Sequence, residues 1–176
     1  MSVENRNVAH AAHGLRRLAW LVAIISVAGA LAWWWLADLS TIVGENFAAM
    51  RPSPQTLVNM RLAGLAIEMA PLAMQLYIAR LLHRFADKIE HGEAFDTAPL
   101  YRRLGMAAIA LGGIEIATGT LARAVLTLIG NPHMLSIGLA MSAGDLYLML
   151  VGAILISTSA IIALAQTAKR ENDQFV

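Results

Sequence analysis

Three ionisable residues stand inside otherwise apolar stretches of this sequence: Glu68, Glu115 and Arg123. A charged side chain inside hydrocarbon costs about 2.5–3.5 kcal/mol on insertion scales, so such residues normally face protein or water and have a partner. Helix geometry places Glu68 and Arg123 each about 9 Å inside the outer end of its apolar run, whereas Glu115 lies near the middle. The spacing therefore predicts an ion pair between Glu68 and Arg123, provided that their helices are neighbours.

Helical spacing extends these residues into a predicted polar seam between the second and third apolar runs. Glu115 and Arg123 are eight residues apart and share one helix face, as do Glu68 and Gln75 at a spacing of seven. The predicted members of the seam are Glu68, Gln75, Glu115, Thr118 and Arg123. Small residues on the third run would allow close helix approach there: Gly112, Gly113, Thr118 and Gly119.

Two interpretations of the seam stay open. In the structural one, a buried Glu–Arg pair fixes the helix register, and a neutral Glu115 forms a hydrogen bond with a neighbouring group. In the functional one, the seam is a proton or ion relay or a polar ligand pocket, because intramembrane charges often mark such sites. Four short helices leave little room for a transport pathway, which favours the structural interpretation.

The sequence lacks the residues that disulfides, haem or metal sites and the common catalytic motifs require. The chain has no Cys, which excludes disulfides, thiolate metal sites, Cys nucleophiles and Cys-linked haem. None of the five His lies in an apolar run, so a bundle haem has no axial ligands. The nine Met could bind Cu(I), but Met more often fills gaps between helices. No hydrolase, metalloprotease or phosphate-loop motif occurs. We expect no enzyme, no cofactor and no metal site.

The composition indicates that this chain is solvated by a lipid bilayer. Of its 176 residues 58% are hydrophobic and 14% are charged, against about 45–50% and about 25% in soluble domains. The run 18–36 is too long for a secretory signal and ends in three Trp, which favour the membrane interface. We predict an all-α bundle of four transmembrane helices within residues 18–166. The predicted spans are 18–36, 62–79, 104–129 and 146–165.

The basic residues predict the orientation. Ten of the 13 Lys and Arg precede the first run, lie between the second and third, or follow the fourth. Because positive residues mark the cytoplasmic side, both the segment 1–17 and the tail 167–176 should be cytoplasmic, as expected in a bacterial inner membrane. The 13 basic residues nearly balance the 12 acidic ones without a clustered basic face, which argues against nucleic-acid binding.

The connecting segments give further predictions. Proline at 52 and 54 should break any helix within an outer loop at 38–60. The apolar segment at 130–145 is either an interfacial or re-entrant turn or a helical extension of a neighbouring span.

On the cytoplasmic side, Leu82, Phe85 and Ile89 have helical spacing, so the second helix should continue to a stop near Gly92. Asp96 or Thr97 should cap the third helix, with Pro99 in its first turn.

Short motifs in this loop and at the C-terminus resemble those of a known family. They are Gly92-Glu93-Ala94-Phe95-Asp96, Arg102-Arg103-Leu104-Gly105 and Glu171-Asn172-Asp173-Gln174-Phe175-Val176. The chain resembles the bacterial domain of unknown function 2975 family, small four-span membrane proteins with a G-x-x-F…L-R-x-x-G-like loop and a terminal E-N-(D/E)-x-x-V signature. Gly92 and Phe95 fit the loop pattern, the arginines fit it with a small shift, and the tail fits more closely.

The resemblance implies a regulatory or interaction protein without catalytic residues. Members of the family often look like partners of a small helix-turn-helix regulator, so such a regulator or another cytoplasmic protein is the implied partner. The contact residues would be Arg84, Phe95, Arg102, Arg103, Glu171, Asn172 and Phe175. The Gly- and Ala-rich helices also allow a homo-oligomer. The alternatives are a small transporter or channel subunit that uses the polar seam, and a membrane-anchor subunit of a larger complex.

Overall fold

In the residues that it describes, the structure, a computed structural model, contains four long α-helices. It describes residues 3–36, 53–91, 97–130 and 138–173. The helices are α1 (Val3–Leu36), α3 (Pro54–Glu90), α4 (Ala98–Gly130) and α5 (Ala143–Asp173). All four are long and apolar enough to cross a membrane. The predicted all-α class with four membrane-spanning helices is confirmed, and helices of this length and hydropathy are those of a multi-pass membrane protein.

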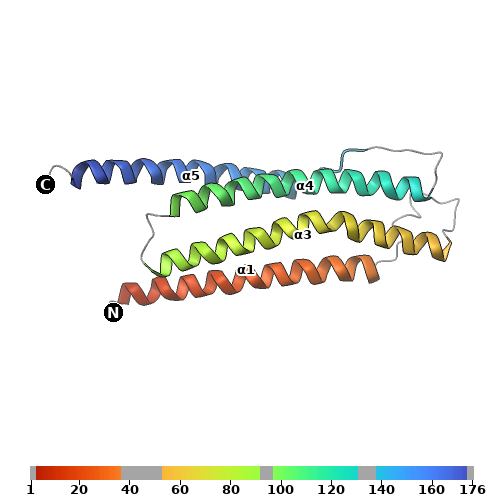
Figure 1. Cartoon of the computed structure of the whole chain (residues 1–176), viewed down its shortest axis with the longest axis horizontal. Coiled ribbons are helices and arrows are strands. Elements are labelled where there is room, and N and C mark those ends of the chain that lie inside the picture. Colours follow the sequence, from red (N-terminus) through yellow and green to blue (C-terminus); the bar gives the residue numbers. More distant parts are fainter. Residues whose placement is uncertain (1–2, 37–52, 92–96, 131–137, 174–176) are drawn as a thin grey trace.

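The helices pack in chain order, α1 on α3, α3 on α4 and α4 on α5 (Figure 1). Val3 and Asp173 lie at the same end of this row, which we call the terminal end; the opposite end is the distal end. In the most apolar 18-residue stretch of α4, 33% of the residues are buried by the other helices, and in that of α5 only 11% are. Large apolar side chains such as Leu21, Met69 and Leu150 stay exposed on the row, as suits a protein surrounded by lipid.

The start of α3 corrects the prediction for the outer loop. The helix begins at Pro54, inside the segment predicted as a loop over 38–60 and eight residues before the predicted span. Ser53 is the N-cap, and its Oγ accepts a hydrogen bond from the backbone N–H of Thr56 at 3.2 Å. Serine at the cap and proline in the first turn both favour a helix start. The Ser-Pro pair therefore initiates a helix here.

The rest of α3 runs without interruption to the terminal end. Pro71 lies inside the helix and lacks the N–H that would bond to the carbonyl of Ile67. The helix is bent along its length rather than straight (Figure 1). It ends at Glu90 with His91 as its cap, which confirms the predicted stop near Gly92.

The other helix starts agree with the sequence in part. Helix α4 begins at Ala98 and has Pro99 in its first turn, as predicted. Helix α5 begins with a reciprocal cap: the backbone N–H of Ser142 donates to Asp145 Oδ2 at 2.7 Å, and Asp145 N–H donates to Ser142 Oγ at 3.2 Å. Helix α1 already begins at Val3, so most of the segment predicted as a separate N-terminal region is the first part of a transmembrane-length helix.

Helices α4 and α5 approach each other most closely at three points, which we call the α4–α5 ladder. Ser159 Oγ donates a hydrogen bond to the carbonyl oxygen of Ala98 at 2.8 Å. A Cβ atom on Gly105 would lie 2.5 Å from the carbonyl oxygen of Gly152, and one on Gly112 would lie 2.9 Å from that of Asp145. Each step is seven residues on both helices, or about two turns, so all three contacts stay on one face.

The prediction that glycines of α4 allow close helix approach is confirmed in part. Gly112 packs on α5 rather than on α3, and a Cβ atom on Gly113 would meet nothing within 4 Å. Gly119 lies near Ala140, 3.0 Å from its Cβ.

One consequence of the ladder is that α5 extends beyond its neighbour. Ser159 is level with Ala98, the first residue of α4, whereas α5 continues for fourteen more residues to Asp173. At about 1.5 Å per residue the overhang is about 21 Å, and Figure 1 shows the blue end of α5 beyond the green start of α4. We call residues 160–173 the α5 projection. Its Ile161 and Leu164 are 68% and 72% exposed.

Candidate functional site

Polar side chains from three helices meet around Glu115 on α4. The side chains of Gln75 on α3 and Asp145 on α5 lie near the Glu115 carboxyl group, and the Glu68 carboxyl is close enough to interact with it electrostatically. We call Glu68, Gln75, Glu115 and Asp145 the polar cluster. Three of its four members were predicted for the seam, and the structure brings these three together.

Asp145 is the member that the sequence analysis missed. It caps α5 and is only 7% exposed. The ladder places its backbone against Gly112, which lies about one turn before Glu115, so its side chain reaches the cluster. The sequence signal was an acidic residue directly before the fourth apolar run. Whether this residue reaches the cluster depends on the register between α4 and α5, and that register cannot be predicted from hydropathy.

Thr118 does not extend the cluster across helices. Its Oγ1 donates to the carbonyl oxygen of Ile114 at 2.8 Å and lies 3.2 Å from that of Glu115, both in its own helix. A threonine inside a helix commonly uses its hydroxyl in this way.

Arg123 lies nearer the distal end than the prediction assumed. Met60 and Leu65 of α3 pack with Leu126 of α4, and Leu81 packs with Leu104 near the terminal end. This register puts Glu68 about six residues, or about 9 Å, away from the level of Arg123 along the row. The reason is that α3 starts earlier than predicted, so Glu68 lies deeper in its helix. The Glu68–Arg123 ion pair stays a prediction.

The polar cluster brings three carboxyl groups from three helices close together within the row. The Gln75 Oε1 atom is buried and has no hydrogen-bond partner. Across the described ranges, no group of three His, Asp or Glu side chains is arranged to hold a metal ion.

At the terminal end, ionic contacts fasten α1 to α3. The Arg16 guanidinium contacts the carboxylates of Asp87 and Glu90, the latter at 2.5 Å. His13 Nε2 lies 3.6 Å from Glu90 Oε1. Further along the same interface, small residues permit close packing, with Ala19 and Ala23 against Ala79. These contacts hold α1 at the edge of the row.

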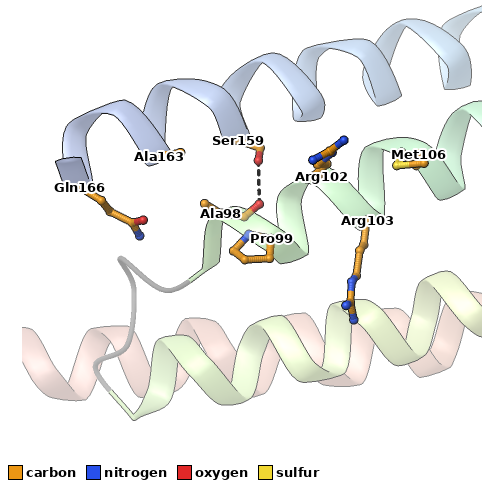
Figure 2. A pocket seen from close by; sticks show the side chains of 8 residues that line it. All are labelled: Ala98, Pro99, Arg102, Arg103, Met106, Ser159, Ala163 and Gln166. Carbon is orange, nitrogen blue, oxygen red and sulfur yellow. Dashed lines mark hydrogen bonds between the residues drawn. The ribbon is translucent and has the colours of Figure 1, made fainter.

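A groove lies at the terminal end between the start of α4 and the later part of α5. Its volume is about 490 Å³, and its walls are more apolar than polar. We call it the terminal groove; Figure 2 shows its lining residues, which are Ala98, Pro99, Arg102, Arg103, Met106, Ser159, Ala163 and Gln166. The Ser159 hydroxyl is already bonded to Ala98. The polar groups that the groove can offer a ligand are therefore Arg102, Arg103 and Gln166.

The predicted partner-contact residues lie at this same end. Arg84, Arg102 and Arg103 are exposed on α3 and α4, and Glu171 and Asn172 are exposed on the α5 projection. Phe95 and Phe175 lie outside the described residues. The sequence alone does not indicate the α5 side of the groove, because that wall depends on which part of α5 faces Arg102.

Similarity to known proteins supplies no function for this chain. Comparison with protein families, with characterised proteins and with solved structures gives no match. The resemblance to the domain of unknown function 2975 family therefore stays a prediction. The polar cluster and the terminal end carry the functional argument.

Proposed function

We propose that this chain is a non-enzymatic, multi-pass protein of a bacterial inner membrane that binds a cytoplasmic protein through its terminal end. Ten of the 13 basic residues belong to segments that the fold gathers at the terminal end. Because positive residues are retained on the cytoplasmic side, this end faces the cytoplasm. The helix-turn-helix regulator implied by the family resemblance would meet the protein there.

The observation that carries this proposal is the α5 projection. The projection extends about 21 Å past Ala98, the first residue of α4. Ile161 and Leu164 are exposed apolar side chains at its base. Together with Ala168 they follow the i, i+3, i+7 spacing by which a helix docks in the groove of a partner.

We expect a cytoplasmic protein to co-purify with the full chain in mild detergent, and replacing Ile161 and Leu164 with serine to reduce its recovery about tenfold. Loss of two buried apolar anchors is expected to cost at least about 1–2 kcal/mol of binding energy. The measurement is a pull-down quantified by mass spectrometry, with elution volume as the test of intact fold.

A matched control changes another face of the same projection, through Thr167→Ala and Arg170→Gln, and should keep the partner. Equal recovery with both double variants would contradict docking on the apolar face. Recovery of a larger membrane enzyme in place of a cytoplasmic protein would favour the anchor-subunit alternative.

The polar cluster supports a second candidate function, the handling of protons across the membrane. Three carboxyl groups from three helices lie together within the row. If they form a pathway, liposomes holding the protein will dissipate an imposed pH gradient, and Glu115→Gln will abolish this flux while the variant elutes like the wild type. Equal flux in protein-free liposomes, or in the variant, would leave the cluster with a structural role.

A further inference from the structure

The terminal groove combines positive charge with an apolar wall. Arg102 and Arg103 are exposed on α4 beside Met106, and Ala163 and Gln166 line the α5 wall. Arg102 lies on the side of α4 nearer to α5, whereas the Arg103 side chain extends towards α3 (Figure 2). Arg170 follows Gln166 by one turn on α5 and adds a further positive charge on that side. A ligand for such a groove has a negative group joined to an apolar part.

The position of the two arginines along α4 fits the depth of a lipid phosphate. Arg103 precedes the centre of the α4 apolar run by about thirteen residues, or about 20 Å. The hydrocarbon ends about 15 Å from the bilayer centre, and the headgroup region extends to about 20–22 Å. The guanidinium groups are therefore level with the phosphates of the leaflet, and Met106 lies closer to the acyl chains.

The chemistry of the groove favours a phosphate over other anions of that region. Arginine presents several N–H donors in a planar fork and binds phosphate oxygens bidentately. Helix α4 begins at Ala98 on the groove wall. The positive end of its helix dipole therefore lies at the groove, where it favours a negatively charged group. Basic pockets between transmembrane helices on the cytoplasmic side are suited to acidic lipid headgroups.

We propose that the terminal groove binds the phosphate of an anionic phospholipid from the leaflet at the terminal end, with Arg102 on the phosphate, Arg103 adding positive charge beside it, and an acyl chain along Met106. The site goes beyond the proposed partner binding and needs only the membrane placement of α4. Lipid bound there would fill the space between α4 and the α5 projection. The bound lipid would thereby stabilise the orientation of the α5 projection relative to α4.

The test is native mass spectrometry of the full-length protein in detergent, with phosphatidylglycerol and phosphatidylcholine added at equal concentrations. We expect the wild type to retain phosphatidylglycerol preferentially and the double variant Arg102→Gln/Arg103→Gln to reduce that preference about tenfold, since charged hydrogen bonds contribute about 1.5–3 kcal/mol. The double variant Arg80→Gln/Arg84→Gln removes the same charge from exposed positions on α3, outside the groove, and should change the preference by less than about twofold. Equal losses in both double variants would overturn the site, because the effect would then be one of net charge.

A second variant keeps the charge and fills the groove. Ala163→Leu on the groove wall should also abolish the preference, whereas Ala165→Leu, exposed on the same helix but outside the groove, should not. Retention of the preference in Ala163→Leu would overturn the proposal. Inorganic phosphate serves as a third probe. If it displaces phosphatidylglycerol at equal concentration, the groove is a site for soluble phosphate, and the assignment to lipid is wrong.

Discussion

Replacing Trp34 with alanine is expected to lower the free energy of unfolding by about 3–5 kcal/mol, the cost typical of removing a buried aromatic side chain. Trp34 is 6% exposed and forms a core cluster with Met60 of α3. Its ring lies directly against Gly64, so close that no Cβ atom would fit there. The side chain therefore fixes the distal part of α1 on α3, and its loss leaves a cavity that these two helices cannot close.

The neighbouring tryptophans provide the control for this prediction. Trp33 and Trp35 are 60% and 66% exposed, so alanine at either position should cost less than about 1 kcal/mol. Helix content in detergent, followed by circular dichroism during thermal or dodecyl-sulfate unfolding, gives the comparison. Similar losses at all three positions would contradict the orientation of α1 and indicate that the tryptophans act through the lipid interface.

The second large effect is expected at the α4–α5 ladder. Gly105→Ala places a Cβ atom 2.5 Å from the carbonyl oxygen of Gly152 and 2.7 Å from the Ile156 side chain. The backbone contact cannot yield as a flexible side chain would, so the two helices must separate. We expect a loss of about 1–3 kcal/mol in the free energy of unfolding, measured by the same unfolding experiments.

A glycine eight residues further along α4 should respond in the opposite direction. Gly113 has no atom within 4 Å of a Cβ position, so Gly113→Ala should stabilise the helix by about 0.5–1 kcal/mol through backbone entropy alone. The ladder predicts opposite signs for the change in the free energy of unfolding in Gly105→Ala and Gly113→Ala. If both substitutions stabilise the protein, α4 and α5 do not approach at Gly105.

The class and number of the helices could be predicted from the sequence because the bilayer imposes both. A run such as 146–165 without a charge can only be a membrane-spanning helix, and its hydropathy needs no tertiary information. The ends of the helices were less predictable. Pro54 was interpreted as a helix breaker, but beside the Ser53 cap it is a first-turn proline. Serine and proline together favour either a loop or a helix start, and the residues after them decide between the two.

The candidate site, too, could be predicted from the sequence only in part. Helical periodicity was enough to group Glu68 with Gln75 and to place Glu115 opposite them, because each pattern lies within one helix. Asp145 and the groove wall at Ala163 were missed because they depend on the offset between α4 and α5. That offset is set by Gly105, Gly152 and the other close contacts, whose seven-residue spacing gains meaning only when the two partner helices are known.

The order in which the helices pack determines how the protein comes apart. Helix α1 makes its extensive contacts with α3 alone, and α5 makes its extensive contacts with α4 alone. As in a linear array of repeats, each interface then contributes its own nearest-neighbour energy. A defect at the Trp34 contact should release α1 and leave α4 and α5 paired. The row would then melt by fraying from its two flanks, with separate transitions instead of one cooperative step.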